Sequence, residues 1–223
     1  CIRDSFKIII IQREMSEGGE EQKYKLEIEG EEPRESSKDF TGKATATYPN
    51  GEIYEGEFKD GLRDGQGKYT YVNGDVYEGD WIENNRHGIG KVEYKDKGVY
   101  YGDWVQGKRH GEGLFTYPNQ DLYSGKWEDG NKQGVGTFIF FDTGMKLYGS
   151  WKAGKFVEGK WIYPNGTFFE GKYDNNRPKG VGAWNFNNGN LVKGEYSQMV
   201  KVNTDQNDPS KPDEEILVWK TAA

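Results

Sequence analysis

Two histidines are the first candidates for chemistry, because imidazole is the commonest metal ligand and acid–base group near neutral pH. His87 and His110 lie 23 residues apart, each in an Arg-His-Gly triplet. Asp64, Gln133 and Lys179 occupy the same place in neighbouring segments of the same pattern. A position that accepts any polar side chain is typical of a solvated loop. The sequence therefore does not favour a metal-binding or acid–base role for the two histidines.

Other short motifs imitate known sites. Residues 141–144, Phe-Asp-Thr-Gly, contain the triplet of an aspartic protease loop, in a slot where other segments place a turn. Residues 102–109 approach a phosphate-binding loop, but Arg109 stands where a hydroxyl should hold magnesium. Asn165-Gly166-Thr167 has the form of a glycosylation sequon. Cys1 has no base nearby in the sequence to activate its thiol. We predict no enzyme activity, catalytic residue, cofactor or metal.

The composition limits what kind of core can form. The chain has 223 residues, of which 33% are hydrophobic and 30% charged, yet it contains 32 Gly, 7 Trp, 15 Tyr and 11 Phe. Disordered chains are poor in aromatic residues, so we expect a folded protein stabilised by rings and not by a thick aliphatic core. The longest aliphatic run, Ile8–Ile11, is far short of the roughly 20 residues of a membrane helix.

The charges are unevenly distributed. The net charge is −7, and residues 14–39 hold ten acidic and four basic residues. Residues 40–200 hold 21 acidic and 20 basic residues, an even mixture that gives no electrostatic footprint for nucleic acid and makes a membrane partner unlikely. A single cysteine and no leader pattern favour an intracellular protein, with Met15 as a plausible natural start.

A glycine repeat organises residues 40–196. The glycine of a Tyr-x-Gly-x-Trp-like motif recurs at intervals of 22 to 24 residues, at Gly56, Gly79, Gly102, Gly125, Gly149, Gly171 and Gly194. A second glycine follows every 23 residues, at Gly67, Gly90, Gly113, Gly136, Gly159 and Gly182. A repeat that keeps its phase over seven cycles indicates a stack of identical structural units.

Each unit predicts a β-hairpin. Tyr54, Gly56 and Phe58 alternate with Glu55 and Glu57, so the aromatic and charged side chains point to opposite faces of a strand. A second short strand follows, and Asn-Gly pairs at 50–51, 73–74, 165–166 and 188–189 predict tight turns. We therefore predict an all-β fold, an elongated single-layer antiparallel sheet of about seven stacked hairpins with flexible tails and almost no helix.

Residues 54–74 resemble the MORN repeat, and the resemblance covers residues 40–196. It implies the hairpin stack and an interaction scaffold. The acidic N-terminal segment, the sequence Thr-Gly-Met-Lys-Leu-Tyr-Gly-Ser-Trp at 143–151, and the end of the array at 176–196 are similar to the axonemal radial spoke head proteins of the spoke protein 1 and spoke protein 10 type. Ala44, Lys97 and Gln120 depart from the repeat consensus, and the long acidic tail of these relatives is absent.

The resemblance implies a structural subunit of the ciliary or flagellar radial spoke head. It places the protein in the cytoplasm and cytoskeleton, at the axoneme, with other spoke head proteins and a second copy of this chain or a related MORN protein as expected partners. Two alternatives remain open: a membrane or phosphoinositide tether, and a cytosolic adaptor for a motor or signalling protein.

The predicted organisation has three parts: an acidic, partly disordered segment 1–39, the array 40–196, and a tail 197–223. The apolar alternations at 24–28 and 216–219 are either loosely ordered tails or strands that cap the sheet. Within the array, a single-layer sheet leaves one side of its rings without a second protein layer, and large apolar surfaces usually mark partner sites. The aromatic residues that we predict to bind a partner are Tyr77, Trp81, Tyr100, Trp104, Tyr123, Trp127 and Trp151.

Overall fold

The structure, a computed structural model, describes residues 23–201 and 214–222, and within these residues it contains strands and no helix. This confirms the all-β prediction. The strands are β1 (Lys25–Glu27), β2 (Gly42–Thr47), β3 (Ile53–Lys59), β4 (Leu62–Thr70), β5 (Val76–Ile82), β6 (Asn85–Tyr94), β7 (Gly98–Val105), β8 (Lys108–Thr116), β9 (Leu122–Glu128), β10 (Asn131–Ile139), β11 (Lys146–Lys152), β12 (Lys155–Ile162), β13 (Phe168–Asp174), β14 (Arg177–Asn185), β15 (Leu191–Lys201) and β16 (Glu214–Thr221).

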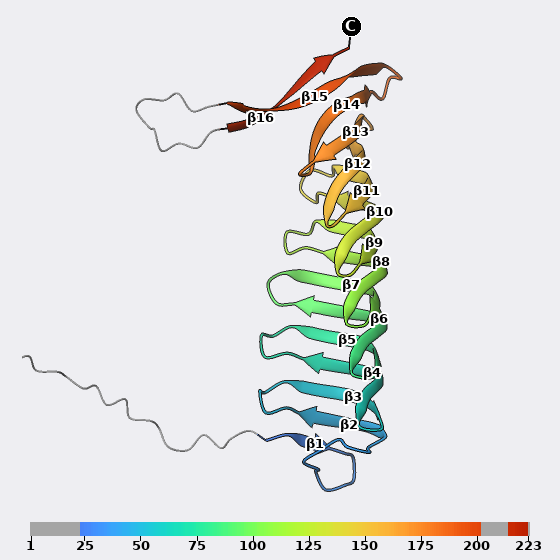
Figure 1. The fold of residues 1–223 in the computed structure, drawn as a ribbon, viewed down its shortest axis with the longest axis vertical. Helices are drawn as coiled ribbons and strands as arrows, with labels where there is room; N and C mark the ends of the chain where they lie inside the picture. The colour runs from blue at the N-terminus through green and yellow to red at the C-terminus, as the bar shows by residue number, and fades with distance from the viewer. Residues whose placement is uncertain (1–22, 202–213, 223) are drawn as a thin grey trace, which may run out of the picture.

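The 16 strands form one open sheet in which their spatial order is their order in the chain. Every neighbouring pair is antiparallel, from β1 with β2 to β15 with β16. The result is the elongated stack of hairpins in Figure 1, with β1 near one end and β16 at the other. The predicted single-layer antiparallel sheet is therefore the fold.

The sheet extends past the limits predicted for the array. β1 contains fully buried Leu26, and Trp219 of β16 packs at 4.9 Å from the ring of Tyr196. Of the two interpretations of the flanking segments, the structure shows capping strands. The predicted boundary at residue 196 falls inside β15. The predicted disorder before residue 40 falls largely on residues 1–22, which lie outside the described part of the chain, as does the segment 202–213.

Two kinds of turn connect the strands, and the Asn-Gly pairs supply only one of them. In the turn at 48–51 the N–H of Gly51 donates to the carbonyl of Tyr48 at 2.9 Å, and only Gly51 has a positive φ. The two-residue turns that need two positive φ angles lie at the opposite edge of the sheet. They are 60–61, 83–84, 106–107, 129–130, 153–154 and 175–176, with φ values between 46° and 84°.

The repeat glycines form a continuous row across the sheet. Gly79 lies opposite Gly67 on one side and Gly90 on the other, and the same pairing runs from Gly56 to Gly194. A Cβ built on Gly90 would lie 2.4 Å from the hydroxyl oxygen of Tyr77, so the row must stay free of side chains. In most hairpins the register shifts beside this row, which is typical of a β-bulge that bends a strand.

The bend lets one sheet cover its own core. In Figure 1 the halves of the strands next to the Asn-Gly turns lie flat above one another, and the other halves curl away from them. The fully buried side chains lie along the inside of this curve and include Tyr54, Tyr77, Tyr100, Tyr123, Phe156 and Phe169. The prediction that one side of the rings is left uncovered is therefore wrong, because the curled sheet itself supplies the second wall.

Candidate functional site

The predicted interface aromatics lie in the core of the curved sheet. Tyr77, Tyr100 and Tyr123 are 0% exposed, and the four tryptophans Trp81, Trp104, Trp127 and Trp151 are 2–4% exposed. The prediction that they share one face and recur in successive units is correct. Their role in binding a partner stays a prediction, and their burial leaves a partner almost no ring surface to contact.

Each tyrosine is fixed against the glycine row of its own repeat. The Tyr77 hydroxyl donates to the carbonyl of Asp80 at 2.8 Å, and the Tyr100 hydroxyl donates to that of Asp103 at 3.0 Å. Tyr54 and Tyr123 repeat the same hydrogen bond. Burial raises the pKa of these phenols well above the usual range, because the phenolate would lose its hydration. These phenols therefore stay protonated near neutral pH and act as hydrogen-bond donors in the core.

The tryptophans join one repeat to the next. The indole N–H of Trp104 donates to the carbonyl of Gly90 at 3.0 Å, a residue of the preceding hairpin. Its ring also lies 5.4 Å from that of Tyr77 at an interplanar angle of 82°, an edge-to-face contact. Trp81, Trp127 and Trp151 make the corresponding hydrogen bonds to Gly67, Gly113 and Gly136.

A row of cations covers the tryptophans, and our reading of the sequence missed it. The side-chain cation of each repeat lies over the tryptophan of the next strand pair: Arg63 over Trp81 at 4.6 Å, Arg86 over Trp104 at 4.3 Å, Arg109 over Trp127 at 4.4 Å and Lys132 over Trp151 at 4.8 Å. The signal was present, since these four residues are spaced by 23 and all carry a positive charge. Cation–π contacts of this kind stabilise the stack.

The same cations hold the two-residue turns of the next repeat. Arg86 Nη2 donates to the carbonyl of Gly107 at 2.7 Å, and the N–H of Gly107 donates back to the carbonyl of Arg86 at 2.9 Å. Arg109 and Gly130 form the same reciprocal pair. Lys132 lacks the guanidinium fork, and burial, with a smaller contribution from nearby Arg109, lowers the pKa of its ammonium group to about 8.

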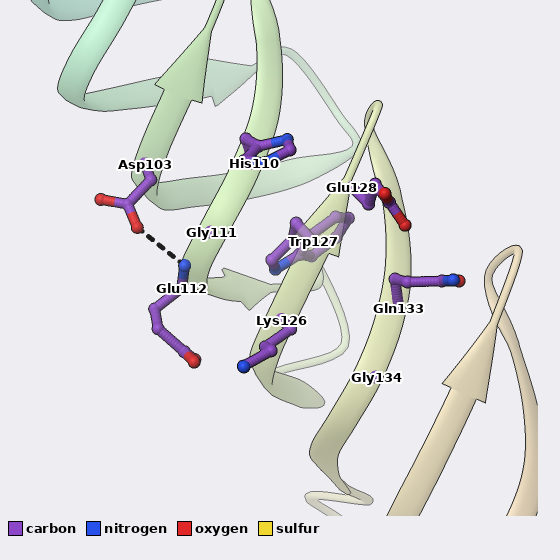
Figure 2. A pocket seen from close by; sticks show the side chains of 9 residues that line it. All are labelled: Asp103, His110, Gly111, Glu112, Lys126, Trp127, Glu128, Gln133 and Gly134. Carbon is purple, nitrogen blue, oxygen red and sulfur yellow. Dashed lines mark hydrogen bonds between the residues drawn. The ribbon is translucent and has the colours of Figure 1, made fainter.

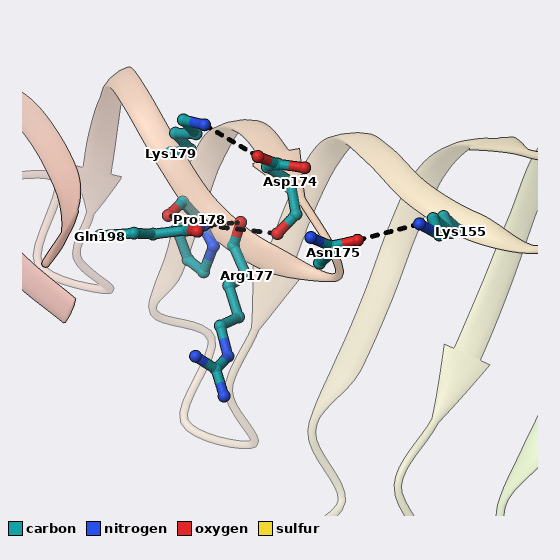
Figure 3. A network of polar contacts seen from close by, with 7 residues as sticks. All are labelled: Lys155, Asp174, Asn175, Arg177, Pro178, Lys179 and Gln198. Carbon is teal, nitrogen blue, oxygen red and sulfur yellow. Dashed lines mark hydrogen bonds and ion pairs between the residues drawn. The ribbon is translucent and has the colours of Figure 1, made fainter. Parts of the chain in front are cut away.

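The row ends at the fifth unit, where apolar residues take the place of the cation. Phe156 is fully buried and packs 4.5 Å from the ring of Tyr173, and Pro178 takes the position in the sixth unit. Gln198 of β15 holds the adjoining turn by donating to the carbonyls of Asp174, Arg177 and Pro178 at 3.3–3.4 Å (Figure 3). The last repeats are thus stabilised by a different set of contacts.

The acidic residues near the bulges are structural. Asp103 Oδ2 accepts a hydrogen bond of 2.8 Å from the N–H of Glu112, and Asp80 does the same for Ile89. Beside Asp103 lies a shallow hollow of about 390 Å³ lined by residues of β7 to β10, including His110, Lys126 and Trp127 (Figure 2). Lys126 and Glu112 lie opposite each other in the strand register, so the hollow has both signs of charge.

The candidate chemical motifs do not come together in this structure. His87 and His110 lie on β6 and β8, partly buried beside the bulges and not in solvated loops as expected, and no group of His, Cys, Asp or Glu side chains suited to a metal is found among the described residues. Residues 141–144 form the turn between β10 and β11, where the N–H of Gly144 donates to the carbonyl of Phe140. Cys1 lies outside the described residues.

No helix that could cross a membrane is present in the part of the chain that the structure describes. The remaining observation is architectural: a repeated hairpin whose tyrosine, glycine, tryptophan and cation each have one fixed place. Such a unit is typical of a repeat scaffold that holds surfaces in fixed positions.

A match to a known protein family agrees with this architecture. The MORN repeat matches residues 54–76, 77–99, 100–122, 123–145 and 148–168. Among curated proteins no sequence matches. Among solved structures, the SAS-4 (dCPAP) TCP domain of Drosophila melanogaster, in complex with a proline-rich motif of Ana2 (dSTIL), is similar with 19% identity and a TM-score of 0.44, over 68% of this chain and 83% of that one. The five matches cover half of the sequence, and the chain belongs to the MORN repeat family.

Proposed function

We propose that this chain is a non-enzymatic structural subunit of the ciliary or flagellar radial spoke head, a repeat scaffold for the protein contacts that axonemal motility needs. The observation that carries the scaffold role is the continuous sheet from β1 to β16. The sheet buries its own aromatic core and leaves a long outer face and two rows of turns exposed. Rigid repeat stacks of this kind present extended surfaces to partners.

The likeness to radial spoke head proteins supports the location. Residues 143–151 and 176–196, which carry it, belong to the turn before β11, to β11 itself, to the turn after β13, and to β14 and β15. These strands hold two departures from the regular repeat, namely Leu147 in place of the core tyrosine on β11 and Pro178 in place of the cation on β14.

The test is localisation and rescue with the full chain. We expect a tagged copy in a ciliated cell to follow the axoneme, to co-purify with radial spoke head subunits, and to restore beating when the endogenous protein is removed. Cytosolic signal without spoke components would contradict the proposal.

A second measurement separates the alternatives. Co-sedimentation with phosphoinositide vesicles, together with signal at membranes, would favour the tether. Co-purification with a motor or signalling enzyme from cells without cilia would favour the adaptor.

A further inference from the structure

The outer face of the sheet contains two rows of side chains on the side of the glycine row nearest the Asn-Gly turns. The strand register defines the first row as Val76, Glu93, Val99, Thr116, Leu122, Ile139, Lys146 and Ile162, from β5 to β12. It defines the second row, over the same strands, as Glu78, Lys91, Tyr101, Leu114, Ser124, Thr137, Tyr148 and Lys160. Both rows belong to the strand halves next to the Asn-Gly turns, which are the halves that lie flat above one another in Figure 1.

The middle of these two rows, from β7 to β10, contains no charged residue. We call the following residues of β7 to β11 the outer patch: Val99, Tyr101, Leu114, Thr116, Leu122, Ser124, Thr137, Ile139 and Tyr148. Tyr101 is 56% exposed, Tyr148 48% and Leu114 39%. No core function requires aromatic and aliphatic side chains here, because the core lies on the other face. An uncharged surface with exposed aromatic and aliphatic side chains marks a contact with another molecule.

The charges that flank the outer patch are net acidic at one end, where Lys91 lies beside Glu78 and Glu93, and basic at the other. Glu78 and Glu93 lie on β5 and β6, before the patch, and Lys146 and Lys160 lie on β11 and β12, after it. Within the chain, Glu93 pairs with Lys91, and Lys160 lies 3.9 Å from Glu170 and 4.6 Å over the Phe168 ring. All four flanking side chains remain at least partly exposed.

This arrangement is complementary to itself. A twofold axis parallel to the strands, between β8 and β9, brings β6 of one copy onto β11 of a second copy and β5 onto β12. Such an axis places the first row of one copy against the first row of the other, and the second row against the second row. Glu93 therefore faces Lys146 of the second copy, and Glu78 faces Lys160 of the second copy. Lys91 faces Tyr148 of the second copy, and the uncharged residues of β7 to β10 face one another between these pairs. Twisted sheets that pack face to face cross at about 30°. This crossing shifts the facing residues sideways, and the long Glu and Lys side chains can bridge the shift at their distance from the axis.

The geometry points to a symmetric dimer of this chain, formed by the outer patch and held in register by Glu93–Lys146 and Glu78–Lys160. Eight strands at about 4.8 Å spacing and two rows of side chains give an area of about 500 Å² per copy, below the ~800 Å² of a stable interface. The dimer is therefore reversible and concentration-dependent. It does not depend on an axonemal location, since only residues of this chain take part.

Sedimentation equilibrium of the full chain, from micromolar to several hundred micromolar, tests the dimer. We expect Glu93→Lys alone and Lys146→Glu alone each to weaken self-association by about tenfold, because each change replaces two attractions by two repulsions. An equimolar mixture of the two variants should associate as the original chain does, since the mixed dimer places lysine opposite glutamate at both sites. Higher salt should reduce the difference between the variants.

The control is a second pair of charge reversals on exposed residues beyond the bend, Lys59→Glu and Glu128→Lys, which should leave association unchanged alone and when mixed. Circular dichroism of every variant verifies that the sheet is retained. A full chain that stays monomeric over the whole range would overturn the proposal. So would a dimer that ignores Glu93 and Lys146, or one that the mixture fails to restore, because each result places the contact elsewhere.

Discussion

The guanidinium carbon of Arg86 lies 4.3 Å from the ring centroid of Trp104, one hairpin further along the stack. The same Arg86 side chain donates to the carbonyl of Gly107 in the turn that follows Trp104. The Arg86 side chain thus connects the core of the next hairpin to the two-residue turn of that same hairpin. The relationship recurs at Arg109 and Trp127, so it is a property of the repeat.

Arg86→Met should destabilise the protein by about 1–2 kcal/mol, because it removes a cation–π contact and a charged hydrogen bond while keeping the apolar stem. Arg86→Lys keeps the charge but loses the planar fork, so its cost should lie between those of Met and the original residue. Urea unfolding measures both. Equal midpoints for all three proteins would show that the contact contributes nothing.

Gly113→Ala should cost about 3 kcal/mol or prevent folding, because the new methyl group would lie 2.5 Å from the ring of Tyr100 and a packed core resists added atoms. Gly107→Asn is the matched control. Gly107 has a φ of 78° and open space around it, and Asn84 and Asn176 occupy the same turn position in other repeats. Thermal unfolding should separate the two variants clearly, and similar melting temperatures would contradict the steric account.

Lys132 should make stability rise with pH above 8. Its pKa is lowered to about 8 in the folded chain, whereas an exposed lysine has a pKa near 10.4. The unfolded chain therefore binds more protons between these values, so the free energy of unfolding increases from about pH 8 to pH 10. Lys132→Arg should abolish this increase and stabilise the protein at pH 7. An unchanged pH profile in the variant would contradict the assignment to Lys132.

Asp80→Ala and Glu78→Ala should differ although the residues are neighbours on the outer face. Asp80 accepts a hydrogen bond from the N–H of Ile89 in the bulge, so its removal should cost about 1–2 kcal/mol. Glu78 is exposed, and its removal should change stability by less than about 0.5 kcal/mol. Denaturant midpoints measured side by side decide this. An unchanged midpoint for Asp80→Ala would mean that the bulge needs no acceptor.

Trp104→Ala should cost about 3–5 kcal/mol of folding free energy, because a buried indole leaves a cavity and an unpaired carbonyl at Gly90. The measurement is chemical unfolding of the full chain. If the tryptophan face binds a partner, as predicted from the sequence, Trp104→Ala should also lose partner binding. A Trp104→Ala protein as stable as the original chain would contradict the burial of this ring.

The strand order could be predicted because Gly56, Gly79 and Gly102 mark successive hairpins that can pair only with their neighbours. The burial of Trp104 could not, because alternation shows which residues share a face but not that the face folds onto itself. The bend depends on which glycines meet across strands, as Gly90 and Gly102 do. Arg86 was visible in the repeat phase, yet its contact with Trp104 requires a distance that spacing alone does not give.

The strictly sequential pairing of the 16 strands also determines how the chain acquires its structure. Each hairpin contacts only the hairpins before and after it, so the sequence separation between contacting residues is small. Folding can therefore begin at any unit and propagate to the neighbouring units. Unfolding should follow the same rule. A destabilising substitution in a hairpin in the middle of the stack should unfold that hairpin and its neighbours first. The halves on either side then lose cooperativity with each other while each still retains its own pairing.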